Sequence, residues 1–197
     1  LAEVCTDFMA LLDHLRLDRV MVIGHDWGAV LAWYLAIHHP ERITHLVAVS
    51  VGHPTAFARA GLKQKVRSWY TVYFTMAGLA ERLLLGSGRL SARRLLASHP
   101  DVDAVLDRLR SPGRLTAALR LYRANLLTLL LKRFGPAQCP VLGIWSEDDV
   151  ALTERQMLDS ELRVTGPFRY RRFTGGHWIP LDQPERLATE ILDFAAR

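Results

Sequence analysis

The segment that most limits the possible folds of this chain is a strand, a tight turn and a helix in direct succession. The apolar run "RVMVIG" (19–24) enters the turn "GHDWG" (24–28), and the helical pattern "AVLAWYLAIHHPER" (29–42) follows at once. A short, β-branched, uninterrupted apolar run is typical of a strand buried on both faces of a parallel sheet. The glycines at both ends of the turn remove side chains that would collide where strand and helix approach, and the residue between them is predicted to be strained and exposed.

Asp26, in the middle of this turn, has two interpretations. A turn of the form small-x-X-x-small between a strand and a helix is a nucleophile elbow, which presents its central side chain beyond the carboxyl end of the strand. In that case the backbone N–H of Trp27 is placed at a helix N-terminus to stabilise an oxyanion. Aspartate is also a good N-cap, so an ordinary capped helix explains the same letters. The turn alone favours neither interpretation.

The rest of the chain alternates between strand and helix patterns. Buried strands are predicted over 43–50 and 139–146 and a weaker strand over 169–175, with amphipathic helices over 3–16 and from Pro184 onward. Alternating strands and helices indicate an α/β domain with a parallel sheet.

Residues 56–136 interrupt this alternation. The segment is rich in leucine and arginine, contains no convincing strand, and is punctuated by glycine and proline turns. The sequence therefore predicts an α/β core formed by residues 1–55 and 137–197, with an all-helical lid formed by residues 56–136.

Composition excludes several classes of function. The net charge is +5, but the arginines are scattered over amphipathic patterns, so nucleic acid is not an expected partner. No apolar run is long enough for a membrane span. The two cysteines, Cys5 and Cys139, lie far apart without metal-ligand spacing, so neither a metal site nor a disulfide framework is expected. We expect no cofactor, and the absence of a signal-peptide pattern favours a cytoplasmic location.

Two further segments complete a catalytic pattern with Asp26. Acids follow the third predicted strand directly in "IWSEDDVAL", and His177 follows the fourth in "TGGHWIPLDQP". The order nucleophile, acid, histidine along the chain is the order of the α/β-hydrolase arrangement. Each residue alone is unremarkable, but three of them in this order, each just past a strand, favour the elbow interpretation of Asp26.

These segments resemble the α/β-hydrolase superfamily and, within it, the epoxide hydrolase group with an aspartate nucleophile. "GHDWGAVLAWYLAIHHPERI" is similar to the elbow and helix of that group, "WSEDDVAL" to its acid loop, and "GGHWIPLDQPE" to its histidine loop. The register of the acid loop identifies Asp149 rather than Asp148 as the acid. In the lid, "SWYTVYFTMAGLAE" and "AALRLYRAN" resemble the segments that carry two catalytic tyrosines, which fall at Tyr70 and Tyr122.

The resemblance implies a two-step reaction on a small lipophilic epoxide. Asp26 would open the ring and form an alkyl ester while Tyr70 and Tyr122 donate hydrogen bonds to the ring oxygen. His177, oriented by Asp149, would then activate a water to hydrolyse the ester, with Trp27 holding the oxyanion. His25 is expected to be a packed or hydrogen-bonded neighbour.

Two alternatives remain open from the residues. A haloalkane dehalogenase uses the same aspartate, histidine and acid, and Trp27 would suit a halide, although the two tyrosines favour an epoxide. The other alternative is an incomplete or non-catalytic relative, because no "HGxP" loop occurs in the chain and about half of the family's sheet is missing. The chain starts inside a helical pattern, so we expect a piece of a longer protein, with one strand edge unpaired and weak turnover in isolation. The sequence does not specify an oligomeric state.

Overall fold

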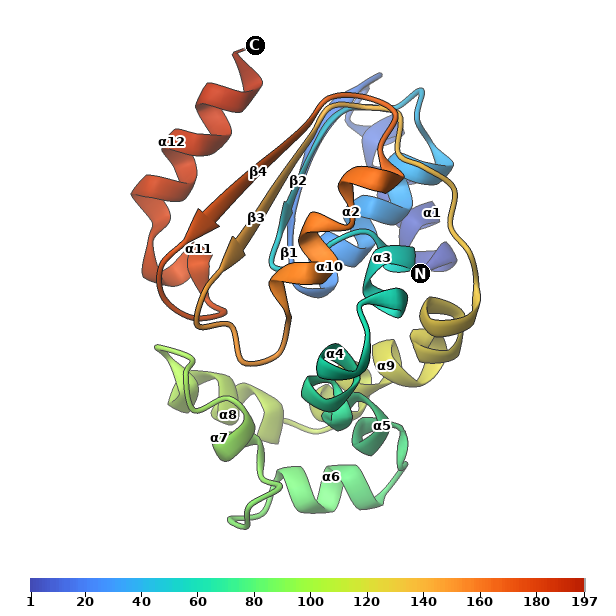
Figure 1. The fold of residues 1–197 in the computed structure, drawn as a ribbon. Coiled ribbons are helices and arrows are strands. Elements are labelled where there is room, and N and C mark those ends of the chain that lie inside the picture. The colour runs from blue at the N-terminus through green and yellow to red at the C-terminus, as the bar shows by residue number, and fades with distance from the viewer. Residues whose placement is uncertain (197) are drawn as a thin grey trace.

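The computed structural model describes residues 1–196, and its centre is a sheet of four parallel strands. The strands are β1 (Val20–His25), β2 (Ile43–Val49), β3 (Val141–Ser146) and β4 (Phe168–Phe173), and they lie side by side in chain order. Each one falls within two residues of a predicted strand. Their carboxyl ends lie along one edge of the sheet (Figure 1).

Helices cover the two faces of the sheet (Figure 1). One face carries α1 (Ala2–His14), α2 (Trp27–His38) and α10 (Glu154–Leu158). The other carries α11 (Ile179–Asp182) and α12 (Pro184–Ala195). Side chains alternate between the faces along each strand, so β2 gives Leu46 and Ala48 to the first layer and Val47 and Val49 to the second.

Strand β1 departs from the prediction that it is buried on both faces. It forms one edge of the sheet, and the side chain of Ile23 is 52% exposed. The reason is that α11 and α12 pack mainly on β2, β3 and β4, while α2 covers only the opposite face of β1. Within residues 1–196, β2 is the only strand that pairs with β1.

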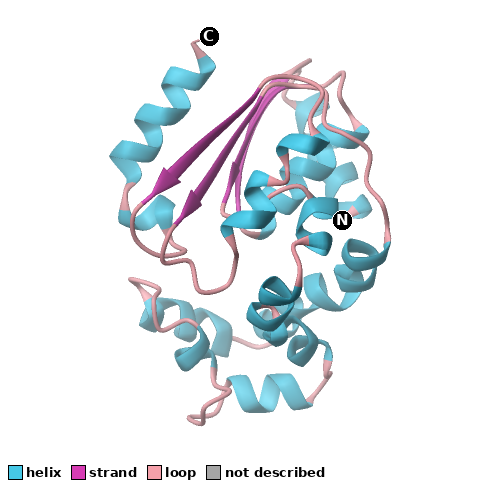
Figure 2. Ribbon diagram, viewed as in Figure 1, coloured by secondary structure: helices cyan, strands magenta, loops and turns pink. Residues whose placement is uncertain are grey.

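The segment between β2 and β3 consists of helices and loops that lie beyond the carboxyl ends of the strands (Figures 1 and 2). Its helices are α3 (Pro54–Arg59), α4 (Leu62–Arg67), α5 (Trp69–Thr75), α6 (Leu79–Leu84), α7 (Ala92–Leu95), α8 (Val102–Arg110) and α9 (Arg114–Leu131). A separate apolar cluster that includes Tyr73, Leu84, Leu106 and Leu119 holds α5 to α9 together.

The two ends of this inserted segment are tied to each other. The side chain of His53 lies 2.9 Å from the carbonyl of Gly135, and Phe134 N–H donates to Thr55 Oγ1 at 2.9 Å. Burial lowers the pKa of His53 to about 4, so its imidazole is neutral at pH 7 and donates to this carbonyl without a charge. The insertion therefore leaves and rejoins the core at one place.

The glycines of the turn have different functions, which gives a first prediction. A Cβ on Gly24 would lie 2.2 Å from the carbonyl oxygen of Gly28, whereas a Cβ on Gly28 would meet nothing within 4 Å. We therefore expect Gly24→Ala to lower the free energy of unfolding by ~1–3 kcal/mol or more, as overpacking does. Gly28→Ala, on the first turn of α2, is the matched control and should lose nothing, since alanine favours a helix by about 1 kcal/mol over glycine. Urea unfolding of both variants measures this, and equal losses would contradict the steric assignment.

Candidate active site

Asp26 stands between β1 and α2 in a backbone conformation that L-residues rarely adopt. Its φ is 53° and its ψ is −121°, and its N–H donates to the carbonyl of Val49 on β2 at 3.3 Å. The N–H of Trp27 donates to Asp26 Oδ1 at 2.7 Å. Both sequence interpretations therefore describe part of the geometry, because Asp26 accepts a hydrogen bond at the start of α2 and also has the strained backbone of an elbow.

Asp149 lies in the loop after β3, here called the acid loop (147–153). Its side chain is only 1% exposed. One carboxylate oxygen, Oδ1, accepts hydrogen bonds from the N–H groups of Ala151 at 2.8 Å and Leu152 at 2.9 Å. The other, Oδ2, lies 2.8 Å from Nδ1 of His177. The neighbouring Asp148 is exposed, so the structure distinguishes between the two acids as the motif did.

His177 lies in the loop after β4, here called the histidine loop (174–178), with its ring between two carboxylates. Its Nδ1 contacts Asp149, and its Nε2 lies 3.4 Å from Asp26 Oδ2. The loop is held by hydrogen bonds to its backbone. His25 Nε2 contacts the carbonyl of His177 at 2.9 Å, and Ser146 Oγ donates to the carbonyl of Gly176 at 2.6 Å. His25 is thus the hydrogen-bonded neighbour that the sequence suggested.

The two carboxylates set the charge of this imidazole. Burial alone would lower the pKa of His177, but the hydrogen bonds to Asp149 and Asp26 and their negative charges outweigh it and raise the pKa to about 10. Burial likewise opposes ionisation of Asp26, yet contact with His177 brings its pKa below the ordinary value. At pH 7 the site therefore holds a carboxylate at Asp26 and an imidazolium at His177. His25 stays neutral, because burial and the charge of His177 lower its pKa.

Tyr70 on α5 and Tyr122 on α9 face Asp26 across a cavity. Both tyrosines, together with Asp26, line two hollows that meet at this carboxylate. Their ring centroids are 6.5 Å apart, and the ring of Tyr122 also packs edge-on against Trp27 at 4.9 Å. Burial raises the pKa of both hydroxyls and the charge of Asp26 adds to the effect, so both are neutral hydrogen-bond donors at pH 7.

The two hollows differ in size and lining. The narrow one, of about 60 Å³, is bordered mainly by aliphatic side chains, among them Val30, Leu126 and Leu129. The wide one, of about 360 Å³, is bordered by His177 and Trp178 and by the cations Arg67 and Arg94. Asp26 therefore lies where a narrow, mostly apolar hollow meets a wider one with cationic side chains at its border.

Sequence reasoning missed several residues that hold the site. Gln64 and Arg67 contact the backbone of the acid loop, and Ser146 contacts the histidine loop. Gln64 and Arg67 lie in "LKQKVR", which looks like a solvated helix surface, and no local signal marks them. Ser146 is the last residue of a predicted strand. A hydroxyl at the carboxyl end of that strand was the signal that could have identified it.

The structure also places the two cysteines, the candidate metal ligands and the longest helices. Cys5 and Cys139 are both buried free thiols. Residues 1–196 bring no three histidine, cysteine or acidic side chains into a metal-binding group. None of the helices in that range combines the length and apolarity needed to cross a bilayer.

Residues 1–184 match the family model described as the alpha/beta hydrolase fold. The chain belongs to this family. The match agrees with the sheet of parallel strands and with the helices that cover its two faces.

Individual relatives carry epoxide hydrolase names. The chain is 26% identical over 206 residues to Epoxide hydrolase 4 of Homo sapiens, an alignment that covers 96% of this chain and 57% of the human protein. It is 26% identical over 239 residues to Epoxide hydrolase A of Mycobacterium tuberculosis, covering 98% and 73% of the two chains. Among solved structures, the epoxide hydrolase of Bacillus megaterium in complex with an inhibitor superposes with a TM-score of 0.83 at 19% identity, covering 98% and 75%.

These relatives are longer than this chain. The chain spans a little over half of several of the curated relatives it matches, such as the human protein at 57%. The structural likeness at 19% identity establishes the shared fold. Within this chain, His177 contacts both Asp26 and Asp149.

The position of His177 between two carboxylates gives a prediction about its pKa. Asp26→Asn removes one of the two charges that hold the imidazolium, so the pKa of His177 should fall from about 10 toward its ordinary value of 6.5. Nitrogen-detected NMR titration of the histidines measures it. Asp148→Asn, an exposed acid beside Asp149, is the control and should leave the pKa unchanged. A fall of the same size in the control would mean that general surface charge sets the value.

Proposed function

We propose that this protein hydrolyses epoxides to diols through an alkyl ester on Asp26. The observation that carries the proposal is the arrangement of the Asp26 carboxylate, with one oxygen held by the Trp27 N–H and the other facing the His177 ring. The homology to proteins named epoxide hydrolases supports it.

The two carboxylate oxygens of Asp26 have different functions in the proposed reaction. Oδ2, which is not held by the backbone, attacks a ring carbon, and the carbon–oxygen bond of the epoxide breaks as the ester bond forms. Oδ1 becomes the carbonyl oxygen of that ester. When water adds to the ester carbon, negative charge develops on Oδ1, where the Trp27 N–H already donates at 2.7 Å. The hydrogen bond of the helix cap thus becomes part of an oxyanion hole.

Proton balance explains how an imidazolium can later act as a base. Esterification neutralises Asp26, which removes one of the carboxylates that raise the pKa of His177. The imidazolium can then release its proton, and the opened ring oxygen gains one. In the second step neutral His177 takes a proton from the attacking water. The bond between the ester carbon and Oδ2 then breaks, and the departing diol oxygen takes the second proton of the water. Asp26 is again an ionised carboxylate and His177 an imidazolium, so one epoxide and one water give one diol.

Tyr70 and Tyr122 act on the ring oxygen in the first step. An alkoxide is a poor leaving group unless it receives hydrogen bonds, and both hydroxyls border the hollow that contains Asp26. Their raised pKa values keep them protonated. Because α5 and α9 carry them, we assign residues 56–136 as a cap that completes the site, over the core formed by residues 1–55 and 137–197.

Trapping of the ester is the decisive experiment, on the protein at its natural length. His177→Gln should allow ester formation but block its hydrolysis, so incubation with styrene oxide should add the mass of one substrate to the peptide that contains Asp26. Intact-protein and peptide mass spectrometry detect the adduct, and Asp26→Asn is the control that should give none. Absence of an adduct from both styrene oxide and a chloroalkane would refute the nucleophile assignment. Chloride release without diol formation would indicate a haloalkane dehalogenase instead.

The tyrosines give a separate prediction about the first step alone. Tyr70→Phe and Tyr122→Phe should each slow ester formation by ~10²-fold, the lower end of what general acid catalysis contributes. Tyr73→Phe, a nearby tyrosine whose hydroxyl contacts only backbone carbonyls of Ala80 and Leu90, should leave the rate near that of the parent. Stopped-flow measurement of the single-turnover rate separates this step from hydrolysis. An unchanged rate in both site variants would remove the tyrosines from the mechanism.

A further inference from the structure

The acid loop is held from the outside by helix α4, which belongs to the inserted segment and not to the sheet that carries Asp149. Gln64 on α4 is 2% exposed. Its Nε2 donates to the carbonyl of Ala151 at 3.0 Å, and its Oε1 accepts from both the N–H and the hydroxyl of Thr153 at 2.8 Å. A buried amide whose two ends both contact one loop fixes the position of that loop, because each lost hydrogen bond would leave a buried polar group unpaired.

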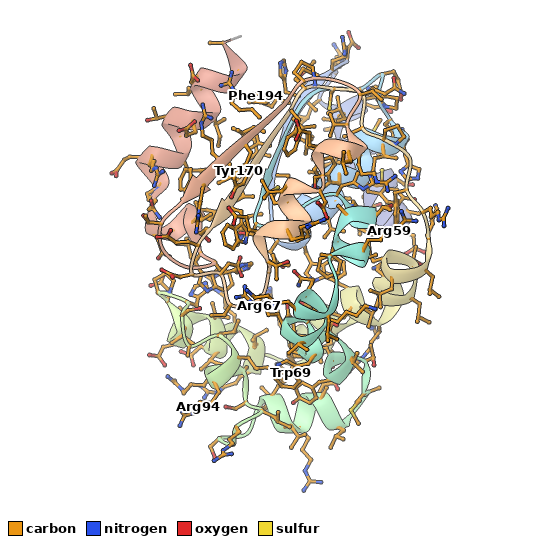
Figure 3. All side chains as sticks on the ribbon, in the orientation of Figure 1. Arg59, Arg67, Trp69, Arg94, Tyr170 and Phe194 are labelled. Atoms are coloured by element: carbon orange, nitrogen blue, oxygen red, sulfur yellow. The ribbon has the colours of Figure 1, made fainter. Side chains whose placement is uncertain are left out.

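Arg67, one turn further along α4, holds the same loop at Asp149 itself. Figure 3 labels Arg67 among the side chains between the sheet and the inserted helices. Its Nη1 donates to the carbonyl of Asp149 at 2.6 Å and to the carbonyl of Leu152 at 2.9 Å. A guanidinium keeps its charge at all relevant pH values and presents its donors in a fixed planar geometry. The backbone is therefore anchored to one side chain at Asp149 itself and again three residues later.

These contacts complement the bonds that Asp149 makes within its own loop. The N–H groups of Ala151 and Leu152 point to Asp149 Oδ1, while the carbonyls of the same two residues point to Gln64 and Arg67. The peptide group between Ala151 and Leu152 is thus held on both sides, because its N–H donates to Asp149 and its carbonyl accepts from Gln64. Oδ2 remains for His177 at 2.8 Å.

The same short segment also leads to the cavity. Tyr70 follows Arg67 by three residues, at the start of α5, and Arg67 itself borders the wide hollow. Residues 64–70 therefore connect the acid loop to a side chain that faces Asp26 from the opposite side.

We propose that Gln64 and Arg67 are positioning residues that hold Asp149 toward His177 and thereby control the hydrolysis of the Asp26 ester. The proposal rests on the proposed function for its kinetic consequence, but its structural part concerns only the contact between Asp149 and His177. Displacement of a supporting group by about 1 Å can reduce a rate ~10²-fold. The effect should fall on the second step, because neither residue contacts Asp26 in the structure.

The test uses Gln64→Leu, which changes no charge, and Arg67→Met with Arg67→Lys as the conservative variant. Lys65→Met on the same helix is the control, because Lys65 is exposed. With styrene oxide as the probe, Gln64→Leu, whose side chain borders neither hollow, should form the ester at the parental single-turnover rate. Gln64→Leu and Arg67→Met should both hydrolyse the ester about 10–100-fold more slowly, so that the adduct accumulates at steady state. Arg67→Lys should hydrolyse the ester faster than Arg67→Met, since lysine keeps the charge and can reach one carbonyl.

A second readout does not depend on turnover. In Gln64→Leu the pKa of His177 should fall in the NMR titration, because the hydrogen bond to Asp149 is the largest of the contacts that raise it. Circular dichroism and urea unfolding identify a variant that does not fold. In that case the hydrolysis rate and the His177 titration of Arg67→Lys test the proposal. Parental hydrolysis rates and an unchanged His177 pKa in folded variants would overturn the proposal. If no variant forms an ester, the proposed function fails, while the His177 titration still decides whether α4 positions Asp149.

Discussion

The rest of the site depends on one interaction, the contact of a buried imidazolium with two carboxylates. His177 lies 2.8 Å from Asp149 and 3.4 Å from Asp26, and each of these groups would be unfavourable in a buried position without the others. The three residues come from loops after β1, β3 and β4, so only the parallel register of the strands brings them to one edge. The stability of the sheet and the charge state of the site are therefore linked through this contact.

The strained turn at Asp26 is maintained by its surroundings. Its positive φ is unfavourable for a side chain, and the structure holds it with the hydrogen bond to Val49, the cap at Trp27 and the close passage of α2 over Gly24. The same geometry separates the two carboxylate oxygens into Oδ1, which the backbone holds, and Oδ2, which faces His177. A rotatable aspartate on an ordinary loop would lack this asymmetry, because either oxygen could then occupy either position.

Much of this arrangement was predictable from the sequence because the relevant signals are local. The first three strands were visible as apolar runs, whereas the fourth, "RYRRFTG", gave a weaker signal. Asp26, Asp149 and His177 each follow a predicted strand within a few residues. The exposed face of β1 was not predictable. The run "RVMVIG" has the pattern of a fully buried strand, but the burial of a strand depends on which helices and strands pack against it. Gln64 and Arg67 were missed for the same reason. Their partners lie more than 80 residues away, and a polar helix gives no sign that one of its faces is buried.

The inserted segment contacts the core at the acid loop as well as at its own two ends. His53 and Gly135 join its two ends, and α4 joins its interior to the acid loop. Within the insertion, Arg123 on α9 makes a bidentate pair with Glu81 on α6 at 2.7 and 2.8 Å. This pair fixes the helix that carries Tyr122 against its neighbours. A shift of the insertion relative to the sheet would therefore move the tyrosines and the support of Asp149 together. The link between the inserted segment and the acid loop is therefore direct, through hydrogen bonds from α4.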